Sequence, residues 1–147
     1  MYTLPMVELF FIEVMTGGQN DVIDLTGEIR KKISASRIID GSALIFVTGS
    51  TGALTTLEYE PGLIRDLPSL MEKLVPAEST YSHDETWNDG NGHSHLRAAL
   101  IGPSLTIPVT DHKPLLGTWQ QVVFLEFDNR PRERRIVVQV SGETGSD

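Results

Sequence analysis

Apolar positions recur with two different spacings along the chain, and these spacings predict a mixture of strands and helices. Runs rich in β-branched and aromatic residues predict strands at residues 7–14, 43–47, 53–59, 105–109, 119–127 and 134–140. Helical spacing predicts helices at residues 25–36, at 61–75 before Pro76, and around Leu96 before Gly102 and Pro103. Because Pro68 lies within the second helix, we expect its regular part to begin there.

The order of these elements favours an α+β fold over a regularly alternating one. We expect a single domain over residues 1–147, with one large mixed β-sheet and two to three helices packed on it. The continuous apolar run at 43–47 is typical of a strand buried on both faces. Residues 77–92 are polar and aperiodic, which predicts a long functional loop, and the acidic tail at 142–147 is expected to fray.

Composition and charge exclude several classes of protein. The 147 residues include no cysteine, so disulfides, thiol catalysis and thiolate metal sites are impossible. A formal net charge of −8 opposes broad attraction to nucleic acid or to anionic membranes. The apolar opening at residues 1–15 carries two glutamates and lacks the basic start of a secretion signal. No run reaches the roughly 20 apolar residues of a membrane helix, so we expect a soluble cytoplasmic protein without nucleic-acid or membrane partners.

The densest group of candidate functional residues contains three of the four histidines. His83, His93 and His95 lie within thirteen residues, beside several carboxylates. Imidazoles bind zinc and similar ions, so one interpretation is a site for a divalent metal, zinc or magnesium, held by these three histidines. The alternative is a solvated loop in which they only form hydrogen bonds. On a helix His93 and His95 would point about 200° apart, so the two rings need not share a ligand.

The sequence predicts a second candidate site, for anions, at the start of the helix around Leu96. Residues 89–92, Asp-Gly-Asn-Gly, directly precede the predicted helix around Leu96. Glycines let backbone N–H groups approach a ligand, and a helix N-terminus favours a phosphate or carboxylate. Asn91, Gly92 and Arg97 are therefore candidate phosphate-binding residues. Simple capping of the helix by Asn91 or Ser94 is the alternative.

Other polar residues give weaker signals. Ser50 and Thr51 lie in a glycine-flanked turn after the strand at 43–47, where ligand sites often form. Glu58 shares a strand face with Glu60 and is a candidate base, although such pairs are usually solvated. Gln120 follows Trp119, which is either a pocket wall or a core residue. We interpret the fourth histidine, His112, as part of a surface turn.

Seven ordered blocks of the sequence resemble the YjbQ family. They lie at residues 49–54, 58–62, 66–67, 81–83, 89–97, 102–105 and 117–120. The resemblance implies a sheet curled toward a half-barrel, helices outside it and a homotrimer. Asn91 and His95 match positions common to the family, whereas many bacterial relatives have His-Thr-Thr at 49–51 and Asp at His93. A secondary thiamine-phosphate synthase activity is associated with this family, which implies joining a thiazole phosphate to a pyrimidine diphosphate with magnesium.

The leading hypothesis is a small-molecule enzyme that acts on phosphate-containing metabolites, with weak thiamine-phosphate synthase activity as one form of it. The candidate catalytic residues are His83, His95 and Glu58, and the candidate substrate- or phosphate-binding residues are Ser50, Thr51, Asn91, Gly92, Arg97 and Gln120. The first alternative is a trimer that binds or senses a metal or a phosphorylated metabolite without converting it. The second alternative is a protein that serves mainly as an assembly element.

Overall fold

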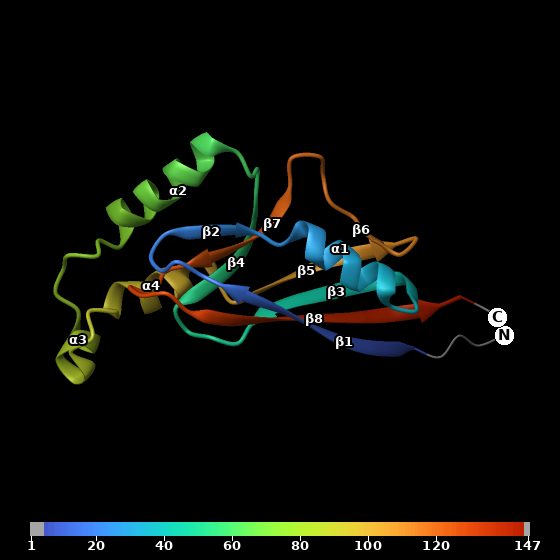
Figure 1. Ribbon diagram of the computed structural model, residues 1–147, viewed down its shortest axis with the longest axis horizontal. Helices are drawn as coiled ribbons and strands as arrows, with labels where there is room; N and C mark the ends of the chain where they lie inside the picture. The colour runs from blue at the N-terminus through green and yellow to red at the C-terminus, as the bar shows by residue number, and fades with distance from the viewer. Residues whose placement is uncertain (1–4, 146–147) are drawn as a thin grey trace.

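Two antiparallel sheets form the frame of the protein, which we describe from a computed structural model over residues 5–145 (Figure 1). The larger sheet has the strand order β1-β8-β3-β5-β6, and the smaller sheet has the order β2-β7-β4. In chain order the elements are β1 (Met6–Met15), β2 (Asp21–Asp24), α1 (Thr26–Ala35), β3 (Ile38–Val47), β4 (Gly52–Leu57), α2 (Pro61–Leu74), α3 (Ser82–Trp87), α4 (Gly92–Ile101), β5 (Ser104–Thr110), β6 (Lys113–Pro114), β7 (Gln121–Glu126) and β8 (Glu133–Thr144). The α+β class is confirmed, but the expected single mixed sheet is instead two sheets, and every strand pairing within residues 5–145 is antiparallel.

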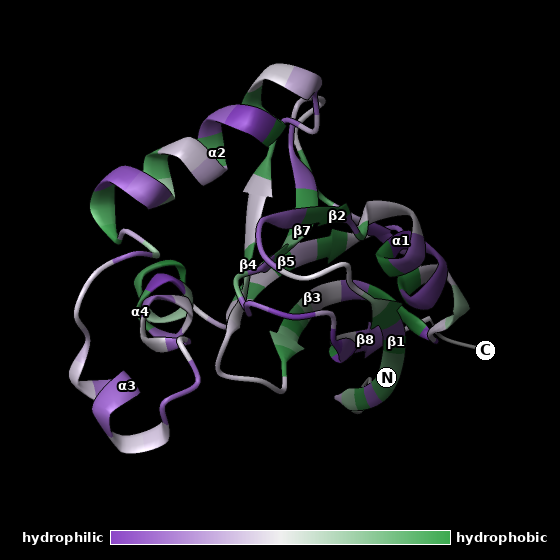
Figure 2. Cartoon of the chain, turned by 60° about the vertical axis from the view of Figure 1, so that its left-hand side comes forward, coloured by the Kyte–Doolittle hydropathy of each residue, from purple (hydrophilic) through white to green (hydrophobic). Residues whose placement is uncertain are grey.

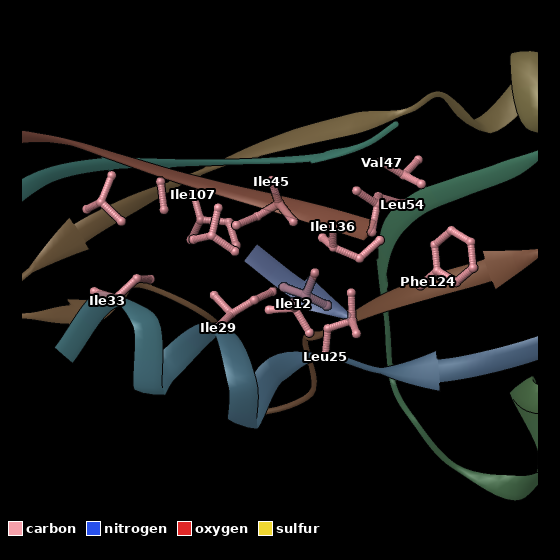
Figure 3. Packing of buried hydrophobic residues seen from close by; sticks show 14 of the residues in the cluster. Ile12, Leu25, Ile29, Ile33, Ile45, Val47, Leu54, Ile107, Phe124 and Ile136 are labelled. Carbon is pink, nitrogen blue, oxygen red and sulfur yellow. The ribbon is translucent and has the colours of Figure 1, made fainter. Parts of the chain in front are cut away.

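The main core lies between the inner face of the larger sheet and helix α1. Ile29 and Ile33, four residues apart, turn one stripe of α1 toward the sheet and are fully buried (Figure 3). Ile45 of β3 and Ile136 of β8 belong to the same cluster. Burial of each such side chain stabilises the fold by about 1.5–3 kcal/mol. The α1 helix starts after Asp24, whose Oδ1 accepts a hydrogen bond from the Thr26 amide over 2.9 Å.

The smaller sheet is packed on both faces. Phe124 faces the main core, whereas its neighbours Val123 and Leu125 belong to a second cluster. Met71 of α2 and Ala98 of α4 are in that second cluster. These two helices therefore gather, with α3, at the end of the molecule away from α1 (Figure 2).

The outer face of the larger sheet remains uncovered in the single chain. Along β1 buried and exposed side chains alternate, and Val7, Leu9 and Phe11 are 62%, 52% and 42% exposed. On β3, Phe46 points to the same outer face and is 37% exposed, so the prediction that 43–47 is buried on both faces was wrong. The strand is half-buried because no helix or second sheet within residues 5–145 packs against this side.

Two further expectations differ from the structure. Helix α2 already begins at Pro61, because the carboxylate of Glu60 accepts hydrogen bonds from the first-turn amides of Gly62 and Leu63, and it continues through Pro68. The tail does not fray from residue 142, because β8 pairs with β3 up to Thr144. Residues 146–147 of the predicted tail lie outside the described residues.

Three short elements were not predicted. These are β2, β6 and α3, of four, two and six residues. Helix α3 lies within the segment that was expected to be a loop. No helix in the described part of the chain is long and apolar enough to cross a membrane.

Candidate functional site

The rings of His83 and His95 face each other where α3 meets α4. Their centroids are 4.4 Å apart and their planes are inclined by 52°. His83 Nε2 lies 3.6 Å from Asp89 Oδ1 and has no hydrogen-bond partner among residues 5–145. Histidine can take up and release protons near neutral pH, so this pair can act as an acid/base group.

Local turns bring the two histidines together across twelve residues. Helix α3 ends at Trp87; the next residue, Asn88, adopts a left-handed conformation with φ 49°, and Gly90 has φ 67°. Two carboxylates then hold the start of α4. Asp84 Oδ1 accepts a hydrogen bond from the Gly92 amide over 3.0 Å, and Asp89 Oδ1 accepts one from the Asn91 amide over 3.1 Å. These bonds fix α4 beside α3.

His95 lies between two cavities. The larger has a volume of about 500 Å³, and the residues that line it with His95 are Thr80, Tyr81, Ser82, His83, Gly92 and Leu96. The smaller has a volume of about 330 Å³, and the residues that line it with His95 are Gly49, Ser50, Gly52, Ala98, Ala99 and Pro103. Both volumes fall in the range of small-molecule sites. A ligand that spans them would touch the histidine pair.

A third cavity, of about 550 Å³, lies at the opposite end of the molecule near His112 and Arg37. It contains none of the residues predicted to form a site. Its size alone does not make it the functional one, because the two facing histidine rings line a different cavity.

His93 points away from the pair, as the helical angle between residues 93 and 95 predicts. It is 2% exposed, its Nε2 lies 3.3 Å from Ser94 Oγ, and its Nδ1 has no hydrogen-bond partner in the described structure. Burial, together with the positive charge of Arg97, lowers the pKa of His93. The three histidines therefore do not share one site. Within residues 5–145 no group of three or more His, Asp or Glu side chains is arranged to hold a metal ion.

Arg97 is fully buried and is bound on three sides. Its Nη2 donates to Glu72 Oε2 over 2.7 Å, its Nε to the carbonyl oxygen of Val75 over 2.9 Å, and its Nη1 to Asn20 Oδ1 over 3.3 Å. Hydrogen bonding from Arg97 lowers the pKa of the Glu72 carboxyl. The guanidinium thus joins α4 to the end of α2, and it lines neither of the two cavities beside His95.

Asp128 connects the other two predicted polar segments. Its carboxylate accepts hydrogen bonds from Thr51 Oγ1 over 2.9 Å, from Asn91 Nδ2 over 3.2 Å and from Arg132 Nε over 2.9 Å. Burial works to raise the pKa of Asp128, but these donors lower it, and the net shift is downward. Thr51 and Asn91 therefore hold the site together and are themselves buried.

A second buried pair supports the same turn. Arg134 Nε donates to Glu126 Oε2 over 2.8 Å, and Arg134 Nη2 donates to Thr51 Oγ1 over 2.7 Å. Sequence reasoning missed this network. The available signal is that two acids, Glu126 at the end of β7 and Asp128 two residues later, follow the apolar run at 122–125. Buried charges of this kind must be paired.

Glu58 and Gln120 lie at the other end of the smaller sheet. In the β4–β7 pair Gly52 is opposite Glu126, whereas Leu57, just before Glu58, is opposite Gln121. A six-residue strand spans about 20 Å. The Gln120 side chain accepts a hydrogen bond from the Gly117 amide over 2.9 Å, and Trp119 is 71% exposed. A single chain therefore does not bring these residues to the histidine pair.

Comparison with known proteins identifies the family. The sequence matches the family described as UPF0047 protein YjbQ-like over residues 11–143. The chain belongs to the YjbQ family. One relative, a UPF0047 protein of Archaeoglobus fulgidus, is 39% identical over 128 residues, which is 87% of this chain and 97% of that protein. A UPF0047 protein of Methanocaldococcus jannaschii is 36% identical over 136 residues, which is 92% of this chain and 95% of that protein.

Solved YjbQ-family structures share this fold. A YbjQ-like protein of unknown function from Sulfolobus solfataricus superposes with a TM-score of 0.84 at 29% identity, covering 94% of this chain and 100% of that chain. An uncharacterized conserved protein of the yjbq/upf0047 family from Clostridium acetobutylicum gives a TM-score of 0.77 at 34% identity, covering 88% and 98%. The names of these YjbQ relatives state no activity, so the chemistry has to be argued from the site itself.

The predicted site residues of this YjbQ-family chain fall into three groups. His83, His95, Ser50 and Gly92 line the two adjoining cavities. Thr51, Asn91, Arg97 and His93 are buried beneath or beside them. Glu58 and Gln120 lie at the far end of β4 and β7. Only the first group is placed to contact a ligand within one chain.

Proposed function

We propose that this protein is a small-molecule enzyme that acts on a phosphate-containing metabolite, with His83 and His95 as its acid/base groups. The observation that carries the proposal is the contact of these two rings, 4.4 Å apart, next to cavities on both sides of His95. His83 Nε2 is enclosed, has no hydrogen-bond partner among residues 5–145 and lies 3.6 Å from Asp89 Oδ1, so a ligand atom would satisfy it if the ring turned toward the cavity.

Support for a phosphorylated ligand comes from the larger cavity. Gly92, the first residue of the ten-residue helix α4, lines this cavity with His83 and Ser82. The Gly92 amide already donates to Asp84 Oδ1, so the support for a phosphate comes from the Ser82 hydroxyl, which can donate to phosphate oxygens, and from the dipole of α4. Asp84 and Asp89 bring negative charge to the same place, which opposes an anion, so hydrogen bonds from Ser82 and from the ring N–H groups of His83 and His95 have to offset it.

A divalent ion, zinc or magnesium, stays a prediction. Two imidazoles and Asp89 approach one another, but the described residues do not form a preassembled metal site. The reaction is therefore proposed without a metal step. Elemental analysis of the purified protein, and repetition of every binding test with zinc or magnesium added, will decide the prediction.

The test of the proposal uses the histidine rings as reporters. We expect inorganic phosphate and pyrophosphate to shift the ring NMR signals of His83 and His95 and to leave those of the distant His112 unchanged.

A turnover assay with a thiazole phosphate and a pyrimidine diphosphate tests the synthase activity. We expect His95→Gln to lower that turnover by about 100-fold or more, the usual effect of losing an acid/base group. His112→Gln is the matched control. Unshifted His83 and His95 signals, or unchanged turnover in His95→Gln, would contradict the proposal.

A binding or sensing protein is the second candidate function. The same cavities would serve it, because a binding site needs no reacting bond. It is favoured if phosphate or a metabolite raises the melting temperature while the ligand is recovered unchanged. It is contradicted if neither phosphorylated metabolites nor divalent ions move the melting temperature.

We further propose that the protein assembles as a homotrimer. The support is the outer face of the larger sheet, where Val7, Leu9 and Phe11 of β1 and Phe46 of β3 are exposed on either side of β8. An apolar patch of this kind on a soluble protein is typical of an interaction surface. A second copy of the chain is its proposed partner.

A further inference from the structure

The segment that joins α3 to α4 contains two dipeptides that favour the same spontaneous reaction, Asp89-Gly90 and Asn91-Gly92. In such a pair the glycine amide nitrogen can attack the preceding side-chain carbonyl carbon, because glycine has no Cβ to obstruct the approach. A third pair, Asp40-Gly41, lies near the start of β3. All three are candidates by sequence, and their surroundings decide which of them can react.

Both reacting groups of Asn91-Gly92 are held in other contacts. The Asn91 side chain is buried, its Nδ2 donates to Asp128 Oδ1 and its Oδ1 accepts from Ser94 Oγ. The Gly92 nitrogen donates to Asp84 Oδ1 over 3.0 Å. Attack of this nitrogen on the Asn91 side chain would break these buried hydrogen bonds, so the folded structure protects the pair.

Asp40-Gly41 is held by the larger sheet. Gly41 lies opposite Val109 of β5 and opposite Gly142 of β8. The Asp40 carboxylate accepts a hydrogen bond from the Asp111 amide over 3.1 Å. Closing a ring between Asp40 and Gly41 would have to disrupt a strand that is paired on both sides, so this pair is protected as well.

Asp89-Gly90 is open where the other two pairs are held. The Asp89 side chain is 43% exposed, and Gly90 is exposed with a φ of 67°. Within residues 5–145 the Gly90 amide donates no hydrogen bond, so its nitrogen is available as a nucleophile. The pair lies in an irregular turn on the surface, which can deform without unpairing a strand or opening a helix.

We propose that Asp89-Gly90 is a site of spontaneous isoaspartate formation, and that this reaction separates the histidine pair. The Gly90 nitrogen bonds to the side-chain carboxyl carbon of Asp89, and one carboxyl oxygen leaves as water with the carboxyl proton and the amide proton. Water then opens the cyclic imide at one of its two carbonyl carbons, which gives either aspartate or isoaspartate. Water is the only other reactant.

Isoaspartate at position 89 changes the turn that holds α4 beside α3. The main chain then runs through the former side chain and is longer by one methylene group. The carboxylate that accepts from the Asn91 amide and lies 3.6 Å from His83 Nε2 becomes an amide carbonyl. Because this turn places His83 against His95, we expect the rings to move apart. The inference depends on this ring contact and not on the reaction proposed for the pair.

The test ages the full-length protein at neutral pH and physiological temperature and maps its peptides. Trypsin places Asp89 and Asn91 in one peptide, residues 74–97, and Asp40 in another, residues 38–65. Isoaspartyl methyltransferase labels isoaspartate, fragment ions locate it, and deamidation of Asn91 is detected by its gain in mass. We expect isoaspartate to accumulate at 89, with neither isoaspartate at 40 nor deamidation at 91.

The same protein unfolded in urea is the control for the role of the fold. An amide loses ammonia more readily than a carboxyl group loses water, so Asn91 should react fastest once its contacts are gone. In the folded, aged protein we expect the original ring NMR signals of His83 and His95 to decrease as isoaspartate accumulates. The signals of the distant His112 should not change.

Three substitutions isolate the reaction. Asp89→Asn and the matched Asp40→Asn each provide the better leaving group, and we expect the first variant to deamidate faster than the wild-type protein isomerises and the second to stay unreacted. Asp89→Glu keeps a carboxylate but would have to close a larger, less favourable ring, so its His83 and His95 signals should persist on ageing.

The outcomes are distinct. The proposal is overturned if the folded protein forms no more isoaspartate at Asp89 than at Asp40, or if Asn91 reacts first. If isoaspartate forms at Asp89 while the His83 and His95 signals stay unchanged, the separation of the pair is wrong.

Discussion

Asp128 and Asn91, thirty-seven residues apart, are joined by a buried hydrogen bond of 3.2 Å from Asn91 Nδ2 to Asp128 Oδ1. Asn91 Oδ1 in turn accepts hydrogen bonds from Ser94 Oγ over 2.7 Å and from the Asn129 amide over 3.1 Å. The bond therefore connects the start of α4, and through it the segment that carries His95, to the loop between β7 and β8.

The first prediction concerns the stability that depends on Asp128. Asp128→Ala leaves Thr51 and Asn91 without their buried acceptor and Arg132 without its counter-charge. We expect the free energy of unfolding, measured with urea, to fall by about 3 kcal/mol. Asp111→Ala removes an exposed carboxylate 3.7 Å from Lys113, so as a control it should change stability by less than about 1 kcal/mol. Equal losses in the two variants would show that the Asp128 network contributes little.

The second prediction separates a structural role of Arg97 from phosphate binding. Arg97→Lys cannot reach Glu72, Val75 and Asn20 together, because an ammonium group lacks the planar fork. We expect a loss of about 2 kcal/mol in urea unfolding, with phosphate affinity at His83 and His95 unchanged in the folded protein. The reverse result, unchanged stability with lost phosphate binding, would support the phosphate-binding role that the sequence predicts for Arg97.

Periodicity predicted the secondary structure best where burial is one-sided. The α1 helix follows from Ile29 and Ile33, four residues apart, because that spacing turns both side chains to one face. Periodicity did not predict which faces of a strand are buried where that depends on the layers packed against the sheet. Phe46 lies in an apolar run but faces outward, and it is exposed because no layer formed by the described residues packs over that face of the sheet.

The candidate site was predicted only in part, because sequence distance hides which residues share a cavity. His83, His95 and Ser50 line adjoining cavities, whereas Glu58 and Gln120 lie at the far end of β4 and β7. The divergence of His93 from His95 follows from helical geometry alone. Asp128 could not be assigned from its local pattern, since its partners Thr51 and Asn91 are 77 and 37 residues away.

The third prediction tests assembly through the outer sheet face. Leu9 is 52% exposed in the middle of β1, and Leu9→Lys places a charge in the apolar patch. If copies pack through this face, burying an unpaired ammonium costs several kcal/mol, and we expect size-exclusion chromatography with light scattering to show a monomer in place of a trimer. Leu115→Lys, at a 61% exposed position on the loop between β6 and β7, is the matched control and should remain trimeric. A trimeric Leu9→Lys variant would place the interface elsewhere.

The last prediction is a pH dependence of stability that arises from His93. Burial and the nearby Arg97 guanidinium lower the pKa of His93 in the folded protein below its ordinary value of 6.5, whereas Glu72 and Asp84 act weakly in the opposite direction. Between the folded and the unfolded pKa the unfolded chain therefore binds more protons, and acid favours unfolding. The contribution of neutral His93 to stability is present above about pH 6.5 and is lost as the pH falls from there through the lower, folded pKa of His93.

We expect the melting temperature to fall over this pH window in the wild-type protein and to fall less steeply in His93→Gln, which does not titrate. His112→Gln is the control and should keep the wild-type slope. If His93→Gln also keeps that slope, another group controls the acid sensitivity, and the buried imidazole is not the residue that couples folding to pH.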